Sequence, residues 1–497
     1  MILAIDQGTT NTKAVLVDRS GQPRARASVR MNVATPQPSW VEQDAEEIWA
    51  SVVRASREAM QQVPGEKIEG IAISNQRETV VAWDRTTSRP VAPAILWQCR
   101  RSEDVCNRMR LDGLESELLA RTGLPIDTLF SASKIRWLLD NIPSLRAKAE
   151  AGAVCFGTVD SWLIWKLTGG TTHACDASNA SRTQLVNLRT REWDPELLAI
   201  FTVPREALPQ IRDSSGCFGR CTAIRELDDV PIISAMGDSH AAMAGHGSYS
   251  LGTVKATYGT GSSLMTLIPS LSPPRREIAT TIAWSLKGIP QYALEGNIAM
   301  AGSAVAWVGE FLGLNNPADD AIALAASVPD SSGVFFVPAM SGLGAPHWDG
   351  AARGTICGLA RTSRAAHLAH AAVDSIAFQI CDVFEAMSAA ADCKLSALHA
   401  DGGATRNSSL MQFQADILQR PVVRSASEEL SALGAAWFGG MALGWWNTVN
   451  DLEKLSAQPT QFHPQISAAQ AKRLYADWKS AVARTLLHTT GEQGPHV

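Results

Sequence analysis

The sequence predicts a mixed α/β protein made of two halves of similar size, and three observations support this class. The 497 residues are enough for two or more domains of ordinary size. Apolar runs of strand length alternate with segments of helical spacing. Two apolar runs flank a Gly-Thr pair near the head of each half, at 8–9 and at 259–260. We therefore expect one domain over 1–246, a second over 247–497, and a ligand cleft between them.

The first half opens with a strand, a turn and a second strand over 2–18 (ILAIDQGTTNTKAVLVD). A helix is expected over 44–63, where apolar residues recur at helical spacing and acidic residues fill the first turn. Residues 68–83 (IEGIAISNQRETVVAW) are typical of two strands separated by a polar interruption. Further helical patterns cover 131–141 and 160–167.

The second half repeats this opening over 252–268 (GTVKATYGTGSSLMTLI), again as strand, turn and strand. Residues 396–418 follow as a strand, a glycine turn and a helix. Segment 428–446 is a helix rich in small residues, which allow close packing on a neighbouring helix. A last helix covers 467–487, and the polar tail 488–497 is expected to be disordered.

The composition is that of an ordinary globular protein, with 45% hydrophobic and 19% charged residues. A net charge of −5 gives no electrostatic reason to expect nucleic acid or an anionic membrane as partner. We expect no signal peptide, because the first apolar run is broken at Asp6, and no membrane insertion, because no apolar run reaches the roughly 18 uncharged residues of a membrane span. The nine cysteines are scattered, and the closest pair, Cys217 and Cys221, has no matching second pair. Reduced thiols and a cytoplasmic location are therefore expected.

Three glycine turns have the composition of phosphate-binding loops: 6–13 (DQGTTNTK), 258–263 (YGTGSS) and 401–407 (DGGATRN). Glycine lets the backbone approach an anion, and N–H groups in such turns donate to it. The P-loop pattern GxxxxGK[ST] does not occur in the sequence. Any one of these segments alone is more often a plain turn, but the three together favour phosphate binding.

Asp6 comes directly before the first glycine turn, at the end of the first predicted strand. A carboxylate beside a phosphate repels it unless a cation lies between them, so Asp6 is a candidate Mg²⁺ ligand, directly or through water. A turn-capping aspartate is the alternative.

Arg77 and Glu78 are adjacent at the break between two predicted strands. Neighbours on a strand point to opposite faces, so both reach one ligand only from an irregular backbone. A donor beside an acceptor suits a polyol, whose hydroxyls donate and accept; a surface ion pair is the alternative. Trp97 offers a flat apolar surface for a carbon chain, or is a core aromatic.

Motifs along nearly the whole chain resemble those of the FGGY carbohydrate kinases and, within them, the glycerol kinases. The segments that carry the resemblance are 4–18, 73–84, 94–101, 156–170, 179–187, 257–263, 341–349, 354–375, 401–418 and 433–440. The resemblance implies two actin/hexokinase-like (ribonuclease H-like) domains, each a mixed β-sheet flanked by helices, with the active site in the interdomain cleft. It assigns polyol binding and the catalytic aspartate to the N-terminal domain, and ATP binding to the C-terminal one.

The same resemblance implies the residues that contact ATP, together with Mg²⁺ at Asp6 through water. These residues are Thr9, Thr10, Asn11, Lys13, Gly259, Thr260, Gly261, Gly302, Gly403 and Asn407. Lys13 stands where glycerol kinases usually have arginine, and a lysine binds phosphate as a point charge.

Asp238 is the catalytic base implied by the resemblance. It lies in AMGDSHAAMAG (235–245), a lone carboxylate among small residues that leave room for a substrate. A primary alcohol loses its proton as it attacks the γ-phosphorus, and a carboxylate within about 3 Å can take that proton. A helix N-cap is compatible with this role, and His240 is expected to be a packing or capping residue.

Three positions depart from the glycerol kinase pattern. Leu129 replaces a usual tyrosine, Ser239 a usual glutamine, and Ser263 a usual phenylalanine. The implied substrate-binding set is Arg77, Glu78, Trp97, Leu129, Asp238, Ser239 and Ser263. Either the enzyme is a glycerol kinase with a looser pocket, or the pocket accepts a longer polyol such as a tetritol, whose extra hydroxyl would meet a serine.

The implied reaction converts glycerol and ATP into glycerol 3-phosphate and ADP. A pentose or pentulose kinase is disfavoured by NQRET and Trp97, and a non-catalytic nucleotide-binding regulator by the presence of both Asp6 and Asp238. The expected partners are a small polyol and ATP, and a homodimer and a homotetramer both stay open. The segment 221–232 is short and acidic, so we expect no inhibition by a sugar bisphosphate.

Overall fold

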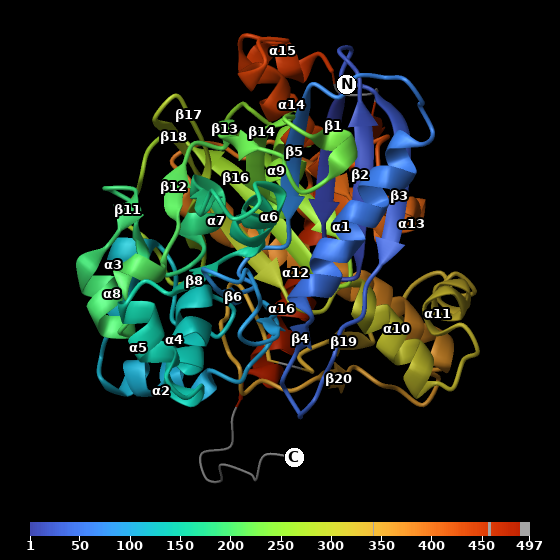
Figure 1. Ribbon diagram of the computed structural model, residues 1–497. Coiled ribbons are helices and arrows are strands. Elements are labelled where there is room, and N and C mark those ends of the chain that lie inside the picture. The colour runs from blue at the N-terminus through green and yellow to red at the C-terminus, as the bar shows by residue number, and fades with distance from the viewer. Residues whose placement is uncertain (341, 456–458, 488–497) are drawn as a thin grey trace. The chain divides into compact units, whose positions relative to one another are not determined.

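A computed structural model describes residues 1–340, 342–455 and 459–487, and Figure 1 labels its helices and strands. The chain divides into two compact units that are not continuous in sequence. Unit 1 contains Met1–Ser250, Leu267–Ala293 and Glu429–Ser456, and unit 2 contains the other described residues. The tail 488–497, expected from the sequence to be disordered, lies outside the described residues.

A six-stranded mixed sheet forms the centre of unit 1, in the order β13-β14-β5-β1-β2-β3. Strands β1, β5 and β14 run parallel to one another, whereas β2 is antiparallel to β1 as the predicted hairpin requires. The strands are β1 (Ile2–Gln7), β2 (Asn11–Val17), β3 (Pro23–Arg30), β5 (Gly70–Asn75), β13 (Ser215–Arg220) and β14 (Pro231–Gly237).

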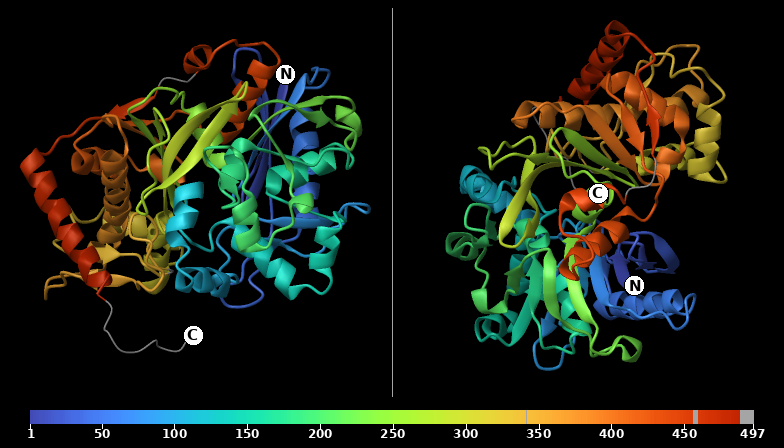
Figure 2. Two further views of the ribbon diagram at one scale, coloured as in Figure 1. Left: turned by 90° about the vertical axis from the view of Figure 1, so that its left-hand side faces the viewer. Right: turned by 90° about the horizontal axis from the view of Figure 1, so that it is seen from above.

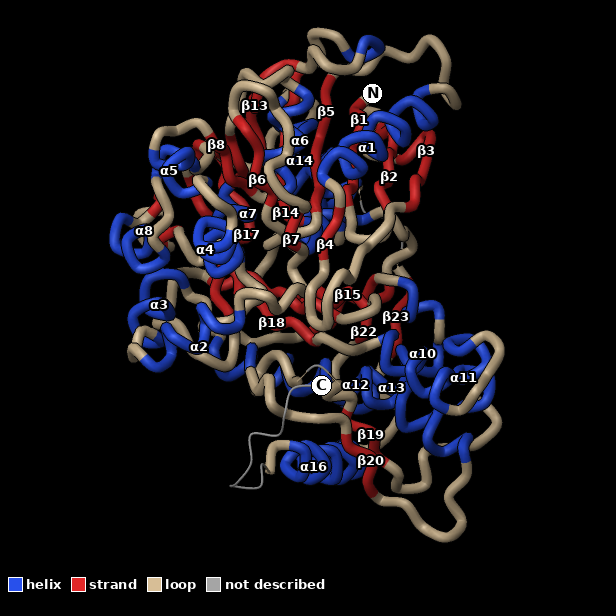
Figure 3. Tube along the Cα trace, turned by 60° about the horizontal axis from the view of Figure 1, so that its bottom comes forward, coloured by secondary structure: helices blue, strands red, loops and turns tan. Residues whose placement is uncertain are grey.

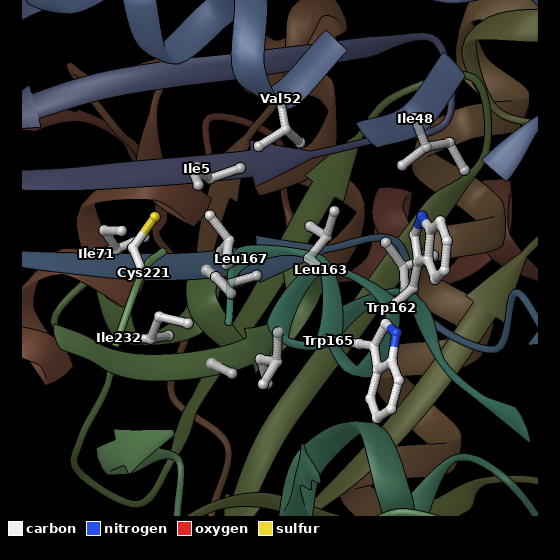
Figure 4. Close-up of a cluster of buried hydrophobic side chains, with 14 of the residues drawn as sticks. Ile5, Ile48, Val52, Ile71, Trp162, Leu163, Trp165, Leu167, Cys221 and Ile232 are labelled. Atoms are coloured by element: carbon white, nitrogen blue, oxygen red, sulfur yellow. The ribbon is translucent and has the colours of Figure 1, made fainter. Parts of the chain in front are cut away.

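Helices cover both faces of this sheet, because alternate residues of its strands point to opposite sides and both sets are apolar. Helices α1 (Ala45–Met60) and α6 (Val159–Leu167) share one buried cluster with Ile5 and Ile71 of the sheet, drawn in Figure 4. Figure 3 shows α1 lying along β2 and β3. Helix α14 (Leu430–Ala442) packs on β1, β5 and β14.

The remaining helices of unit 1 include α4, which spans Ser131–Asn141 as the helical pattern predicts. The others are α2 (Glu103–Leu111), α3 (Glu115–Thr122), α5 (Leu145–Glu150), α7 (Ala177–Ser181), α8 (Pro195–Phe201), α9 (Asp238–Gly245) and α15 (Val449–Glu453). Short strands join them: β4 (Glu42–Gln43), β6 (Val81–Asp84), β7 (Ala94–Ile95), β8 (Val154–Gly157), β9 (Ala174–Asp176), β10 (Val186–Asn187), β11 (Glu192–Trp193) and β12 (Gln210–Arg212).

A second mixed sheet has the strand order β17-β18-β16-β15-β21-β22-β23. Its strands are β15 (Thr253–Tyr258), β16 (Ser262–Ile268), β17 (Ala279–Leu286), β18 (Ile289–Ile298), β21 (Ala397–Asp401), β22 (Val422–Arg424) and β23 (Thr460–Phe462). Strand β15 pairs with β16 in antiparallel fashion and with β21 in parallel, as β1 pairs with β2 and β5. The Gly-Thr echo in the sequence therefore marks a repeated sheet topology.

Five helices flank the strands of unit 2: α10 (Gly302–Phe311), α11 (Pro317–Ala325), α12 (Ala365–Ala390), α13 (Ser408–Leu418) and α16 (Ala468–Thr485), with the small hairpin of β19 (Phe335–Val337) and β20 (Thr355–Cys357). Asp382 joins the orange α12 to the red α16 of Figure 2, since it accepts from Tyr475 Oη at 2.7 Å and Trp478 Nε1 at 2.8 Å. Across the described residues, we find no helix long and apolar enough to cross a membrane.

Helix α14 packs closely on α9, as its small residues predict. A Cβ atom added at Gly434 would lie 1.8 Å from the carbonyl oxygen of Ala241 and 2.8 Å from the amide nitrogen of Gly245. Backbone meets backbone at this crossing, so a larger residue must displace one helix.

We expect Gly434→Ala to lower the free energy of unfolding by about 1–3 kcal/mol, because overpacking outweighs the helix propensity gained from alanine. Urea unfolding measures this loss. Ala442→Leu, at an exposed position of the same helix, is the control, with an expected change within about 0.5 kcal/mol. Equal stability of the two variants would contradict the close packing.

Candidate functional site

Polar side chains gather where β1, β5 and β14 end. Parallel strands present their carboxyl ends at one edge of a sheet, which is where ligands bind in open α/β sheets. In register, Asp6 lies beside Ser74 and Gln7 beside Asn75, and Gly237 lies on the other side of Asn75. Unit 1 thereby brings the Asp6 turn, the Arg77-Glu78 pair and Asp238 to one edge.

Asp6 is held by a hydrogen bond from Ser74 Oγ to its Oδ1 at 2.9 Å. Burial raises the pKa of the Asp6 carboxyl to about 6, the nearby charge of Lys13 opposes that rise, and the charge of Asp238 adds to it. Two neighbouring carboxylates favour a cation close to them.

The first glycine turn lies between β1 and β2, with Thr10 and Asn11 exposed at its tip. Lys13 on β2 forms an ion pair with Glu429, Nζ to Oε2 at 3.0 Å, and Glu429 also lies 3.7 Å from Arg26. Glu429 was missed as a candidate from sequence, because it lies 416 positions after Lys13 and no local motif links the two.

Arg77 and Glu78 are both buried, with 8% and 3% of their surfaces exposed, so the surface ion pair considered for them is wrong. Glu78 has a φ of +58°, and Thr79 N donates to Arg77 O at 2.7 Å. A hydrogen bond from residue i+2 to residue i around a positive φ makes this a strained γ-turn. The irregular backbone that a shared ligand requires is therefore present.

Arg77 also faces Asp238, with Nε donating to Oδ1 at 3.1 Å. Its Nη1 lies 4.0 Å from Glu78 Oε1. One guanidinium thus lies beside both carboxylates, and the three side chains form a compact polar constellation.

Arg182 extends this constellation and was not predicted as a site residue. Its side chain is fully buried, its Nε donates to Glu78 Oε1 at 2.6 Å, and its guanidinium lies 5.0 Å from the centre of the Phe130 ring. In the sequence, the signal for Arg182 was an arginine among the small and apolar residues of NASRTQLVN (179–187). Most of these residues are buried in the structure.

Asp238 is the first residue of α9, and Gly237 occupies the cap position. The N-cap alternative for Asp238 is therefore wrong. Its side chain is 38% exposed, and Gly237 is fixed by Ser178 Oγ, which accepts from its N–H at 3.0 Å. Ser239 and His240, next along the helix, are buried.

Trp97 links the first glycine turn to the Arg77-Glu78 turn. Its Nε1 donates to Thr9 Oγ1 at 3.0 Å, and its backbone N–H donates to Thr79 Oγ1 at 3.2 Å. Each threonine hydroxyl accepts from Trp97 and therefore donates its own hydrogen bond to Gln76 Oε1, at 3.3 Å from Thr9 and 2.9 Å from Thr79. Trp97 is consequently held by hydrogen bonds from both its indole and its backbone N–H, and is not a plain core aromatic.

Leu129 lies just before α4, half-buried against Leu124, Phe130 and Ala279. Its backbone N–H donates to Asp127 Oδ1 at 2.8 Å. An aliphatic side chain thus occupies a packed apolar position just before the start of α4.

Unit 2 brings its predicted glycine residues together. The turn Gly259–Gly261 joins β15 to β16, and Gly302 at the start of α10 donates its N–H to Gly259 O at 2.9 Å. Gly402, with φ of +94°, lies so close to Tyr258 that an added Cβ would be 2.6 Å from the carbonyl oxygen of that residue. The Gly259 and Gly403 turns are neighbours because they follow the adjacent parallel strands β15 and β21.

Two other predicted residues of unit 2 already make side-chain contacts. Asn407 caps α13, its Oδ1 accepting from Ser409 N at 3.0 Å and Leu410 N at 3.1 Å. Ser263 on β16 donates to Glu295 Oε1 at 3.1 Å, and Glu295 is fully buried.

Comparison with known proteins agrees with both halves of this description. Residues 1–245 match the N-terminal domain and residues 254–443 the C-terminal domain of the FGGY family of carbohydrate kinases. The chain belongs to the FGGY family of carbohydrate kinases, as the sequence motifs predict, and has its two-domain fold of two mixed sheets flanked by helices.

Within this family the chain is similar to glycerol kinases. It is 45% identical to a glycerol kinase of Burkholderia multivorans over 486 residues, 97% of each chain, and 45% identical over 488 residues to one of Burkholderia pseudomallei. Among solved structures, a Plasmodium falciparum glycerol kinase with ADP has a TM-score of 0.90 at 31% identity, covering 98% of each chain. A xylulose kinase of Lactobacillus acidophilus shares the fold, with a TM-score of 0.87 at 23% identity.

Proposed function

We propose that this carbohydrate kinase transfers the γ-phosphoryl group of ATP to a terminal hydroxyl of a small polyol, with glycerol as the first candidate. The observation that carries the proposal is the constellation of Arg77, Glu78 and Asp238 at one sheet edge, in a chain 45% identical to glycerol kinases. The strained turn lets a donor and an acceptor face the same polyol hydroxyls.

Asp238 is the proposed base. Its carboxylate takes the proton of the terminal hydroxyl while the substrate oxygen bonds to the γ-phosphorus and the bond to the β-phosphate oxygen breaks, releasing ADP. Arg77 Nε, 3.1 Å from Asp238 Oδ1, holds the carboxylate in place by a charge-assisted hydrogen bond. The exposed fraction of Asp238 is consistent with access by a substrate.

For the nucleotide, we assign phosphate contacts to the three glycine turns. Thr9, Thr10, Asn11 and Lys13 belong to the turn of unit 1, and Gly259, Thr260, Gly261, Gly302, Gly403 and Asn407 to the turns of unit 2. In unit 2 the close approach of Gly302 and Gly402 to neighbouring backbone leaves only small residues around these turns, as an anion-binding loop requires.

The residues around Asp6 fit Mg²⁺. Asp6 supplies a half-buried carboxylate near a second carboxylate, Asp238. Within the described parts of the chain, we find no cluster of three or more potential metal-ligating side chains. Magnesium is commonly held by one or two carboxylates, with water and substrate phosphates completing its shell. When bound, Mg²⁺ would neutralise charge on the phosphate oxygens.

Asp6→Asn is expected to raise the Mg²⁺ concentration for half-maximal activity about tenfold or more, because asparagine keeps the shape but not the charge. A magnesium titration at saturating ATP and polyol measures this. Asp229→Asn, which changes a side chain 77% exposed, is the matched control and should leave the titration unchanged. A normal magnesium requirement in Asp6→Asn would remove Asp6 from the metal site.

An ADP-release assay tests the proposed reaction directly. Glycerol, erythritol, threitol, dihydroxyacetone and pentitols are supplied separately with ATP and Mg²⁺. Turnover well above the ATPase background with glycerol supports the proposal. If no polyol stimulates ADP release, polyol phosphorylation is wrong and the constellation serves another acceptor.

A longer polyol, such as a tetritol, is the second candidate because of Leu129, Ser239 and Ser263. Tyrosine and phenylalanine rings that usually border the carbon chain are replaced by smaller side chains. The hydroxyl of Ser263 is held by Glu295, so it accepts from a ligand more readily than it donates.

The double variant Leu129→Tyr/Ser263→Phe is expected to shift kcat/KM toward glycerol over erythritol by about tenfold, since bulk at these positions excludes a fourth carbon. The ratio of the two kcat/KM values measures the shift. Leu111→Tyr, at an exposed leucine, is the control. An unchanged ratio would argue that these positions do not set the substrate length.

We also assign the chain to the cytoplasm. The nine cysteines are free thiols in the structure, and the sheet-edge site described above uses none of them.

A further inference from the structure

A buried lysine, Lys134, contacts two of the segments that carry proposed polyol-binding residues. Lys134 is in the first turns of α4, and none of its surface is exposed. Its Nζ is within hydrogen-bond distance of three backbone carbonyl oxygens, Leu129 O at 2.5 Å, Phe130 O at 3.4 Å and Glu78 O at 3.4 Å. One ammonium group therefore joins two chain segments that are separated by about fifty positions in the sequence.

Burying an ammonium is costly, so the fold alone does not explain a lysine here. Burial lowers the pKa of Lys134 to about 8, while the carboxylates of Glu78 and Asp127 and the thiols of Cys99 and Cys106 favour its charged form. A methionine would fill the same space without this penalty. A lysine at this position points to a role for its three donors.

The role concerns the strained turn at Glu78. A residue with positive φ keeps that conformation only when its surroundings hold it. The carbonyl of Glu78 accepts from Ser131 Oγ at 3.1 Å and from Lys134, while its carboxylate is held separately by Arg182. Lys134 and Ser131, both on α4, thus hold the backbone of the turn that presents Arg77 and Glu78.

We infer that Lys134 is a positioning residue of the polyol site, whose ammonium fixes the Glu78 turn and the Leu129 segment at one separation. Both segments carry residues that we assign to polyol binding, so one side chain sets the distance between two walls of that site. This inference rests on the proposed polyol kinase function. Lys134 itself does not contact substrate in this proposal.

The test compares three variants in steady-state kinetics with the polyol that the wild-type enzyme prefers. Lys134→Met removes the charge and all three donors at similar volume, and Lys134→Gln keeps two amide N–H donors without the charge. Arg136→Met is the matched control, since Arg136 lies on the same helix and pairs with Asp140 away from the site. KM for polyol, KM for ATP and kcat are measured separately, with circular dichroism to confirm folding.

We expect Lys134→Met to raise the polyol KM at least tenfold with the KM for ATP within twofold, and Lys134→Gln to fall between it and wild type. Arg136→Met should match wild type. Folded Lys134→Met with a wild-type polyol KM, or equal rises in both KM values, would overturn the inference. If Lys134→Met does not fold, the intermediate Lys134→Gln variant decides by the same comparison.

Failure of the proposed function is distinguishable from failure of this inference. A wild-type enzyme that phosphorylates no polyol overturns the function before any variant is compared. A wild-type enzyme that does so, with an unaffected Lys134→Met, overturns only the role of Lys134.

Discussion

Asp238→Asn is expected to lower kcat for polyol phosphorylation by about 10²–10⁴-fold, because asparagine cannot accept the proton that the attacking hydroxyl loses. The amide keeps the size of the carboxylate. Its oxygen can still accept from Arg77 Nε, which lies 3.1 Å from Asp238 Oδ1 in the structure. Binding of ATP, measured by isothermal titration calorimetry, should stay within about twofold. The expected result is thus a loss of chemistry with the nucleotide site intact.

The control for this prediction is Asp229→Asn, an aspartate of the same unit that is 77% exposed and paired with Arg220. It should retain wild-type kcat. If Asp238→Asn turned over polyol at a rate close to that of wild type, the assignment of Asp238 as base would be wrong. A parallel loss of ATP affinity would instead indicate a rearranged site.

The parts of the fold set by local pattern were predictable from the sequence. The two hairpins at 2–17 and 253–268 follow from apolar runs around Gly-Thr turns, and both were found, in sheets of matching topology. Helix α4 begins and ends at the residues where its apolar spacing does. These elements depend on neighbours within a few residues, so periodicity and turn chemistry suffice.

The division of the chain into units was less accessible. Unit 1 also contains residues 267–293 and the segment that begins at Glu429, although unit 2 already begins at Leu251. The small-residue helix α14 could be recognised as a close-packing element, but its partner α9 lies about 190 positions earlier. Local pattern identifies an interface residue without identifying what it packs against.

The same limit explains which site residues were recognised. Arg77, Glu78 and Asp238 lie in short motifs whose composition is unusual, and in the structure they are close together. Arg182, Lys134 and Gln76 act through contacts with residues of distant segments, and each alone resembles an ordinary polar residue of a buried segment. Their roles follow only from the bonds they make in the folded chain.

Arg182→Met is expected to lower the free energy of unfolding by about 3–5 kcal/mol, the second large effect. Arg182 is fully buried and donates to Glu78 Oε1 at 2.6 Å, so its loss removes a close partner from a buried carboxylate. Arg77 Nη1 lies farther from the same oxygen, at 4.0 Å. Removing one partner of a buried pair is far more costly than the net worth of the pair. Urea unfolding measures the loss, and the polyol KM should rise because Glu78 is no longer held.

A second substitution separates stability from binding. In Arg182→Met/Glu78→Gln the buried charge is gone, so most of the lost stability should return, whereas polyol binding should not, because Glu78 is itself assigned to the polyol. Arg146→Met, which breaks a pair with the partly exposed Asp140, should change stability by about 0–1 kcal/mol. If Arg182→Met is as stable as Arg146→Met and binds polyol normally, Arg182 is not what holds Glu78 in place, and the strained turn depends on Lys134 and Ser131 alone.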